Sequence, residues 1–187
     1  ARKHNAKIYV TMNIIPHNED FEGLEEYLIY LENVGVSAII TSSMHIIETA
    51  LRVAPSMEVH ISTQLSISNS ESCHYLEDLG VKRVVLAREV SLEKIKMIKA
   101  KSDISLEVFI HGGMCASYSG KCMLSNHLVN RDANRGGCAH SCRWHYHLYD
   151  QGEELSSFDF GSKDLNGISA ITKLIDLGVD SLKIEGR

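Results

Sequence analysis

The 187-residue sequence predicts an α/β protein that forms most of a barrel of the triosephosphate isomerase (TIM) type, and three observations support this prediction. One sequence motif occurs three times: a helical run ends at a glycine, and a β-branched run follows. Runs with apolar residues three to four apart alternate with runs rich in valine and isoleucine, the βαβα order of a parallel sheet. No glycine-rich phosphate-binding fingerprint follows an expected strand, which disfavours the open dinucleotide-binding sheet.

The repeated motif marks junctions from a helix to a strand. Its three copies are residues 31–40, 76–85 and 174–183, with the glycine fifth in each. Glycine tolerates the left-handed conformation that ends a helix, and the β-branched residues that follow suit a strand buried on both faces. Each copy therefore predicts one αβ junction of a parallel sheet.

Strands are expected at residues 8–13, 38–41, 59–64, 83–87, 106–110 and 182–185. Helices with an amphipathic period are expected at residues 21–31 and 92–98. The pattern breaks between residues 115 and 157, where glycine, asparagine, arginine and histidine are frequent and a short strand is expected at residues 146–149. Loops of this length are usually functional or disordered.

These elements suit one domain, a barrel segment over residues 1–187 with a cysteine-rich loop insertion at about residues 112–160. Six or seven parallel strands fit either an open doubly wound sheet or most of an eight-stranded barrel, and the missing fingerprint favours the barrel. The sequence opens without methionine and stops as the last strand ends, so we expect a piece of a longer, more stable barrel protein.

Composition sets the class of protein. The net charge of -5 is scattered along the chain, and no basic tail indicates nucleic-acid binding, although RNA remains allowed as a substrate. No run approaches the roughly 20 apolar residues of a membrane helix, and the first residues do not form a signal peptide. A cytoplasmic, reducing compartment is therefore expected. Five cysteines, four of them close together, indicate metal or redox chemistry rather than a disulfide framework.

Cys115, Cys122, Cys138 and Cys142 follow the spacing C-x6-C-x15-C-x3-C. The first comes directly after an expected strand, and in parallel α/β folds sites form at the carboxyl ends of strands. Four thiolates suit zinc or an iron-sulfur cluster. Zinc usually uses tight C-x2-C pairs, so the wide spacing favours an iron-sulfur cluster, with zinc and unliganded thiols as alternatives. Cys73, outside the motif, is interpreted as a buried or spare thiol.

Several blocks of the sequence closely resemble peptidase family U32, the collagenase-like proteases. The blocks are residues 107–125, 130–144, 162–165 and 181–187, with residues 13–20 and 60–64 upstream. The resemblance implies an oxygen-sensitive 4Fe-4S cluster on the four cysteines. The branch that carries residues 130–135 is similar to transfer-RNA uridine hydroxylases, for which prephenate is implicated as a hydroxyl donor.

Candidate site residues lie near these blocks and near the ends of the expected strands. Those that could act in catalysis are His111, Glu107, Arg88, Lys183 and Glu185. Those that could bind substrate are Gln64, Arg131, Arg135, Arg143 and Arg187. A buried Glu107 requires a partner such as Lys183 or Arg88. Solvated loop charges are the alternative interpretation of the arginines, and Tyr118 and Trp144 are expected to serve packing rather than base stacking.

The cysteine spacing favours an iron-sulfur enzyme, and the resemblance implies that it hydroxylates a uridine of transfer RNA without molecular oxygen. The alternative is a peptidase acting on collagen-like or unfolded protein, with Cys115 or Cys122 as nucleophile and His111 as base. A redox scaffold that works with a protein partner subunit is a third hypothesis. Neither an H-E-x-x-H zinc helix nor a G-x-S-x-G elbow occurs, so metalloprotease and serine hydrolase chemistry lack their usual motifs.

Overall fold

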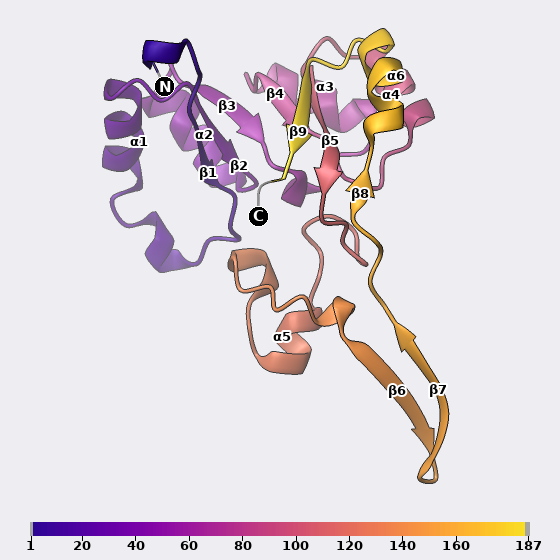
Figure 1. The fold of residues 1–187 in the computed structure, drawn as a ribbon. Coiled ribbons are helices and arrows are strands. Elements are labelled where there is room, and N and C mark those ends of the chain that lie inside the picture. Colours follow the sequence, from indigo (N-terminus) through magenta and orange to yellow (C-terminus); the bar gives the residue numbers. More distant parts are fainter. Residues whose placement is uncertain (1, 186–187) are drawn as a thin grey trace.

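The computed structural model describes residues 2–185, and its main feature is a seven-stranded sheet (Figure 1). Five strands follow one another in sequence order and in parallel: β1 (Tyr9–Met12), β2 (Ala38–Thr41), β3 (Glu58–Ile61), β4 (Arg83–Val85) and β5 (Ser105–Gly112). Strand β9 (Ser181–Ile184) continues the parallel order beside β5, and the two-residue strand β8 (Leu165–Asn166) pairs antiparallel with the end of β5. The chain is therefore an α/β protein with a mainly parallel sheet.

Helices connect the parallel strands. They are α1 (Leu24–Asn33), α2 (Met44–Val53), α3 (Ser70–Asp78), α4 (Leu92–Lys99) and α6 (Ile171–Asp176). Short 3-10 helices are η1 (Arg2–His4), η2 (Asn18–Phe21), η3 (Thr63–Leu65) and η6 (Ile168–Ala170). None of the helices within residues 2–185 is long and apolar enough to cross a membrane.

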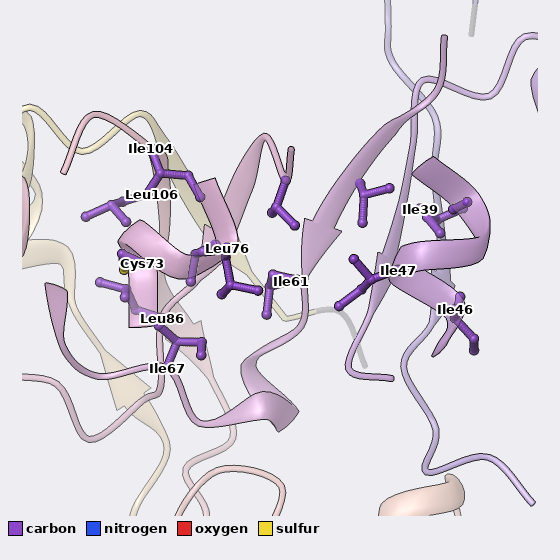
Figure 2. Packing of buried hydrophobic residues seen from close by; sticks show 14 of the residues in the cluster. Ile39, Ile46, Ile47, Ile61, Ile67, Cys73, Leu76, Leu86, Ile104 and Leu106 are labelled. Carbon is purple, nitrogen blue, oxygen red and sulfur yellow. The ribbon is translucent and has the colours of Figure 1, made fainter. Parts of the chain in front are cut away.

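One face of the sheet forms the apolar core with these helices. Alternate strand residues such as Ile39, Ile61 and Leu106 are fully buried beside Ile47 of α2 and Leu76 of α3 (Figure 2). Strands in sequence order with right-handed crossovers place their helices on the same face. The sheet is therefore wound in one direction, without the reversal of a doubly wound fold.

The opposite face of the sheet carries polar and charged residues together with apolar ones such as Ile40 and Val85. Directly partnered residues of parallel strands point to the same face, and the register pairs His60 with Arg83 and Glu107 with Ser181. Lys183 partners Phe109 on this face. The face without helices thus carries a row of polar and charged side chains that leads to the carboxyl ends of the strands.

The predicted elements agree with the structure in kind, and their bounds differ by up to three residues. The helix expected from residue 21 begins at Leu24, because Gly23 precedes it in the left-handed region at φ 70°. The strand expected at residues 59–64 ends at Ile61, because the Ser62 hydroxyl accepts a hydrogen bond from the Gln64 amide and begins η3. The strand expected at residues 83–87 ends at Val85. The strands of residues 2–185 form an open sheet, so the closed barrel stays a prediction.

A long cysteine-rich segment separates β5 from β8. It contains α5 (Leu124–Val129), the 3-10 helices η4 (Ala133–Arg135) and η5 (Ser141–Arg143), and a hairpin of β6 (His145–Asp150) and β7 (Glu153–Asp159). Figure 1 shows this hairpin projecting away from the rest of the protein. The short strand expected at residues 146–149 is confirmed as part of β6, whereas its partner β7 was not predicted.

Candidate active site

A cavity of about 760 Å³ opens where the carboxyl ends of the parallel strands meet the cysteine-rich segment. Its wall from the sheet and the turns after the strands includes Thr11, Gln64, Arg88, Phe109, Lys183 and Glu185. Its wall from the cysteine-rich segment includes Cys115, Cys122, Cys138 and Cys142. All four motif cysteines therefore face one cavity at the edge of the sheet where parallel α/β proteins form sites.

The other three cavity thiols are close enough to Cys115 to affect its pKa. Burial raises the pKa of the Cys115 thiol, the nearby Arg88 lowers it, and the other three cavity thiols raise it further. Within residues 2–185, no group of three or more histidine, cysteine or acidic side chains is drawn together closely enough to hold a metal ion. Cys73 lies elsewhere, fully buried in α3, and burial raises its pKa to about 11.

The loop that carries Cys115 and Cys122 is fixed onto the ends of β3 and β4. A Cβ atom on Gly120 would lie 2.1 Å from the Gln64 carbonyl oxygen, so the backbone approach requires glycine. The Ser119 hydroxyl donates to Glu89 Oε2 at 2.8 Å and accepts from the Arg88 amide at 3.1 Å. The loop is therefore held by backbone contacts and buried hydrogen bonds.

Glu185 links the last strand to the cysteine loop. Its Oε1 accepts from Arg88 Nη2 at 2.9 Å, and its Oε2 accepts from the Gly113 amide at 2.8 Å. The Arg88 guanidinium in turn lies 4.1 Å from the centre of the Phe109 ring, a cation–π contact. These contacts orient a cation and an aromatic ring at the cavity wall.

Glu107 forms a buried ion pair beneath the cavity. Its carboxylate lies 2.9 Å from Lys183 Nζ and 3.5 Å from Arg83 Nη1, and it accepts from the Ser181 hydroxyl at 2.8 Å. Burial would raise the pKa of the Glu107 carboxyl, but Lys183, Ser181 and Arg83 together hold it below its ordinary value. Of the two predicted partners Lys183 is confirmed, whereas Arg88 pairs with Glu185 instead.

His111 lies outside the cavity. It is exposed on β5 next to a break in register after Phe109, and it does not line the cavity. Its backbone carbonyl accepts from the Glu185 amide at 3.0 Å. The structure therefore does not bring the imidazole to the cysteines, and a role for His111 as catalytic base gains no support.

The predicted substrate-binding arginines occupy different places. Arg135 donates to both Asp20 oxygens, at 2.5 and 3.2 Å, and its hydrogen bond lowers the pKa of Asp20 to about 2. Arg143 lines the cavity and pairs with Asp164. Arg131 is exposed. Arg187 lies outside the described residues. Arg135 thus joins the loop after β1 to the cysteine-rich segment. Arg143, at the cavity wall, and Arg131, at the surface, are accessible to a substrate.

Two polar side chains are placed for contact with a ligand or with the cysteine loop. Gln64 lines the cavity, and its Oε1 is buried without a hydrogen-bond partner within residues 2–185. Asn134, which sequence reasoning did not single out, is buried and donates to the Cys122 carbonyl at 3.0 Å. The asparagines between the cysteines in residues 130–135 were the available signal for Asn134.

The aromatic residues of the cysteine-rich segment are more exposed than predicted. Tyr118 is 73% exposed and lines the cavity, and Trp144 is 42% exposed. The expectation that both serve core packing is wrong, because the segment lies outside the apolar core of the sheet and its helices.

An α/β protein with a four-cysteine cavity at the carboxyl ends of its parallel strands is the class that the fold and the site define. The model of peptidase family U32 matches residues 1–187, and the chain belongs to this family. The solved structure entitled "The Structure of the U32 Peptidase Mk0906" is similar over 61% of this chain and 49% of that one, with a TM-score of 0.52 and 15% identity. That likeness concerns the fold alone.

Curated relatives carry names from two functional classes. The chain is 52% identical over 196 residues to tRNA hydroxylation protein P1 of Bacillus subtilis (strain 168), covering 100% of this chain and 46% of the relative. It is 39% identical to the 23S rRNA 5-hydroxycytidine C2501 synthase of Escherichia coli (strain K12), covering all of the chain and 29% of that protein. It is 35% identical to a collagenase of Porphyromonas gingivalis, covering 100% of the chain and 48% of that protein. The chain spans about half the length, or less, of these relatives.

Proposed function

We propose that this protein hydroxylates a uridine of transfer RNA, without molecular oxygen, in the cysteine-lined cavity. The observation that carries the proposal is that all four motif cysteines line the same cavity as Arg88, Lys183 and Gln64. Relatives named for RNA hydroxylation support the choice of RNA over other substrates.

The chemistry of the four cavity thiols, rather than their spacing within residues 2–185, suits a 4Fe-4S cluster. Cys115, Cys122, Cys138 and Cys142 would hold it, and four soft thiolates are the usual ligand set of such clusters. A Cβ atom on Gly137, next to Cys138, would lie 2.6 Å from the Asp132 carbonyl oxygen, so the loop around the cysteines is closely folded. With every iron bound by a cysteine, a cluster supplies electron transfer or helps to hold substrate. Zinc on the same thiols is the alternative.

The cavity residues would bind and orient the reactants. Gln64 offers a buried acceptor that has no partner among residues 2–185, and this acceptor suits an N–H group of a base. Arg88, Arg143 and Lys183 are cations at the wall, each paired with a carboxylate of the protein, and their further N–H groups would donate to the carboxylates of prephenate, the proposed hydroxyl donor. Phe109, beside Arg88, adds an apolar surface that excludes water.

Charge indicates where RNA would lie outside the cavity. Residues 113–144 contain four basic residues, Lys121, Arg131, Arg135 and Arg143, against the single acidic residue Asp132. The hairpin at residues 145–159 contains four acidic residues, Asp150, Glu153, Glu154 and Asp159, and neither lysine nor arginine. Since phosphates attract cations, RNA would contact the cysteine-rich segment and avoid the hairpin.

The open sheet would be an arc of a TIM-type barrel. Its strands are wound in one direction, its helices pack on one face, and its other face leads to the cavity at the carboxyl ends of the strands, as in a barrel that holds a site at one end. The unpaired outer edges of β1 and β9 within residues 2–185 are the places where further strands would close it.

The proposal is tested in cells and on purified protein. Deleting the gene and analysing digested transfer RNA by mass spectrometry should show loss of a nucleoside one oxygen heavier than uridine or its derivative. Restoration should require each of the four cavity cysteines. Protein prepared without oxygen should contain iron and sulfide, about four of each per chain. An unchanged nucleoside profile would exclude the hydroxylase function.

A peptidase remains the second candidate because the family and one relative carry that name. The structure gives this candidate little support, since His111 does not line the cavity that holds the four motif cysteines. Oxygen-free protein that cleaves gelatin, and that loses this activity in Cys115→Ser, would favour the peptidase. Cleavage that survives the substitution would come from a contaminating protease.

A further inference from the structure

The β6–β7 hairpin carries two histidines on one of its faces. His145 and His147 are two residues apart on β6, and side chains at this spacing point to the same side of a strand. Their ring centres lie 4.9 Å apart, with the rings nearly perpendicular. The hairpin projects away from the sheet (Figure 1), so this pair is separate from the cysteine-lined cavity.

Each of the two imidazoles contacts a carboxylate of the opposite strand through the same ring nitrogen. His145 Nδ1 lies 3.0 Å from Asp159 Oδ1, and His147 Nδ1 lies 2.8 Å from Glu154 Oε1. An ionised carboxylate only accepts hydrogen bonds, so each Nδ1 must carry the proton. In the neutral imidazole the lone pair is then on Nε2, the tautomer that binds a metal through Nε2.

The strand beneath the histidines is held in place. On the other face of the hairpin, Tyr146 stacks on Phe158 with ring centres 6.1 Å apart, and Phe160 packs edge-on against both rings. The Tyr146 hydroxyl also donates to the Ser141 carbonyl at 2.7 Å, which ties β6 to the cysteine-rich segment. The two imidazoles therefore stand on a supported strand rather than on a free loop.

We propose that His145 and His147 form a binding site for a borderline divalent transition-metal ion, Zn²⁺ or Ni²⁺, through their Nε2 atoms. Imidazole nitrogens suit these ions, and a carboxylate on the other ring nitrogen is the usual outer partner of a metal-binding histidine. Asp159 and Glu154 act as positioning residues that fix the tautomer and offset the charge of the ion. Water or a group from another molecule completes the coordination.

The test uses the anaerobically prepared protein with its cysteine site filled, labelled with ¹⁵N-histidine and titrated with Zn²⁺. We expect the Nε2 signals of His145 and His147 to shift together and to saturate at one ion per chain, while the signals of His127 and His140 stay in place. Mg²⁺, which prefers oxygen ligands, should leave all signals unchanged. Unchanged iron content during the titration confirms that the added zinc does not enter the cysteine site.

Variants separate this site from unspecific binding. The double variant His145→Gln with His147→Gln should lose one zinc equivalent in calorimetry, whereas His127→Gln, which removes an exposed histidine of α5, should keep it. Glu154→Gln and Asp159→Asn should each weaken zinc binding by about 10- to 100-fold, because the carboxylates orient the rings. The proposal is overturned if zinc leaves the two signals unmoved, or if the double variant binds as much zinc as the parent protein.

Discussion

Cys73 and the four cavity cysteines differ in their surroundings, which leads to a first prediction at the scale of single residues. Replacing Cys115, Cys122, Cys138 or Cys142 with alanine should remove the bound iron and its broad visible absorption. Cys73→Ala should keep both and lower the free energy of unfolding by about 1 kcal/mol, because it removes one buried sulfur atom. Iron analysis and denaturant melts measure the two effects. Loss of iron in Cys73→Ala would contradict the assignment of ligands.

Two glycines of the cysteine-rich segment allow a matched test of the loop contact. Both Gly120 and Gly136 have positive φ, 71° and 83°, but only the first has backbone atoms of Gln64 where a Cβ would lie. Gly136→Ala should cost about 1 kcal/mol of left-handed strain. Gly120→Ala should cost about 2 kcal/mol more, since the loop must move, and should lower the iron content. Equal thermal stability of the two variants would show that the loop does not depend on this contact.

At this scale the sequence predicted which residues gather at the cavity better than it predicted how they are oriented. The cysteines, Arg88, Lys183 and Glu185 lie where the ends of parallel strands meet, as expected from strand order. His111 is exposed rather than on the cavity wall with Phe109, because a register break in β5 lies between the two residues, and alternation alone cannot reveal such a break. The orphaned oxygen of Gln64 depends on packing between distant segments, which no local pattern encodes.

The ion pair between β5 and β9 leads to a prediction at the scale of the elements. Lys183→Met should destabilise the protein by about 3 kcal/mol near neutral pH, because the Glu107 carboxylate would be left buried without its closest cation. Glu107→Gln combined with Lys183→Met should recover part of this loss, since no buried charge remains unpaired. Denaturant unfolding of the two variants measures the difference.

The pH dependence of the same ion pair has a defined sign. In the parent protein the pKa of Glu107 is lowered, so the stability from this group is present above the ordinary glutamate pKa and is lost as the pH falls below it. In Lys183→Met burial would raise the pKa of Glu107, so protonation relieves the unpaired charge. The stability deficit of the variant should therefore shrink between about pH 7 and about pH 4.5. A deficit that stays constant with pH would argue against the pairing.

The contrast in charge between the cysteine-rich segment and the hairpin predicts how transfer RNA binds. Lys121→Gln and Arg131→Gln should each weaken binding and reduce the salt dependence of the affinity by about one unit of slope, because each removes one phosphate contact. Glu153→Gln on β7 is the control and should leave binding unweakened. Binding titrations at several salt concentrations measure the slopes. Equal effects of the three substitutions would place the RNA elsewhere.

Among the elements, helices and strands of the sheet were more predictable than the hairpin. Glycines at the helix ends and apolar periodicity predicted strands β1 to β5 and helices α1 and α4, but not the bounds of α2, and Gly80 and Gly178 indeed adopt positive φ. Strand β7 has every residue exposed, so it lacks the alternation between apolar and polar residues that marks a half-buried strand. Cross-strand pairing with β6 rather than burial holds it, and such pairing leaves little trace in a single sequence.

For the whole molecule, the repeated junctions predicted a parallel sheet with strands in sequence order, because each junction returns the chain to the same edge in the same direction. The repeated junctions do not predict whether the sheet closes into a barrel. It depends on strand number, tilt and stagger, which are properties of the complete set of strands. Within residues 2–185 the sheet ends at β1 on one side and at β9 on the other.

The two ends of the sheet lead to the last prediction. β2 is buried along its whole length and has a paired strand on each side, whereas β1 and β9 are partly exposed and are paired on one side only within residues 2–185. Amides of β1 and β9 should therefore exchange with solvent through local opening, and those of β2 and β3 only through global unfolding. Hydrogen exchange of the 187-residue chain, followed by mass spectrometry at two protein concentrations, measures this difference. Protection of β1 equal to that of β2 at both concentrations would mean that the outer edge of β1 is covered within the monomer, whereas protection that rises with concentration would mean that a second molecule covers it.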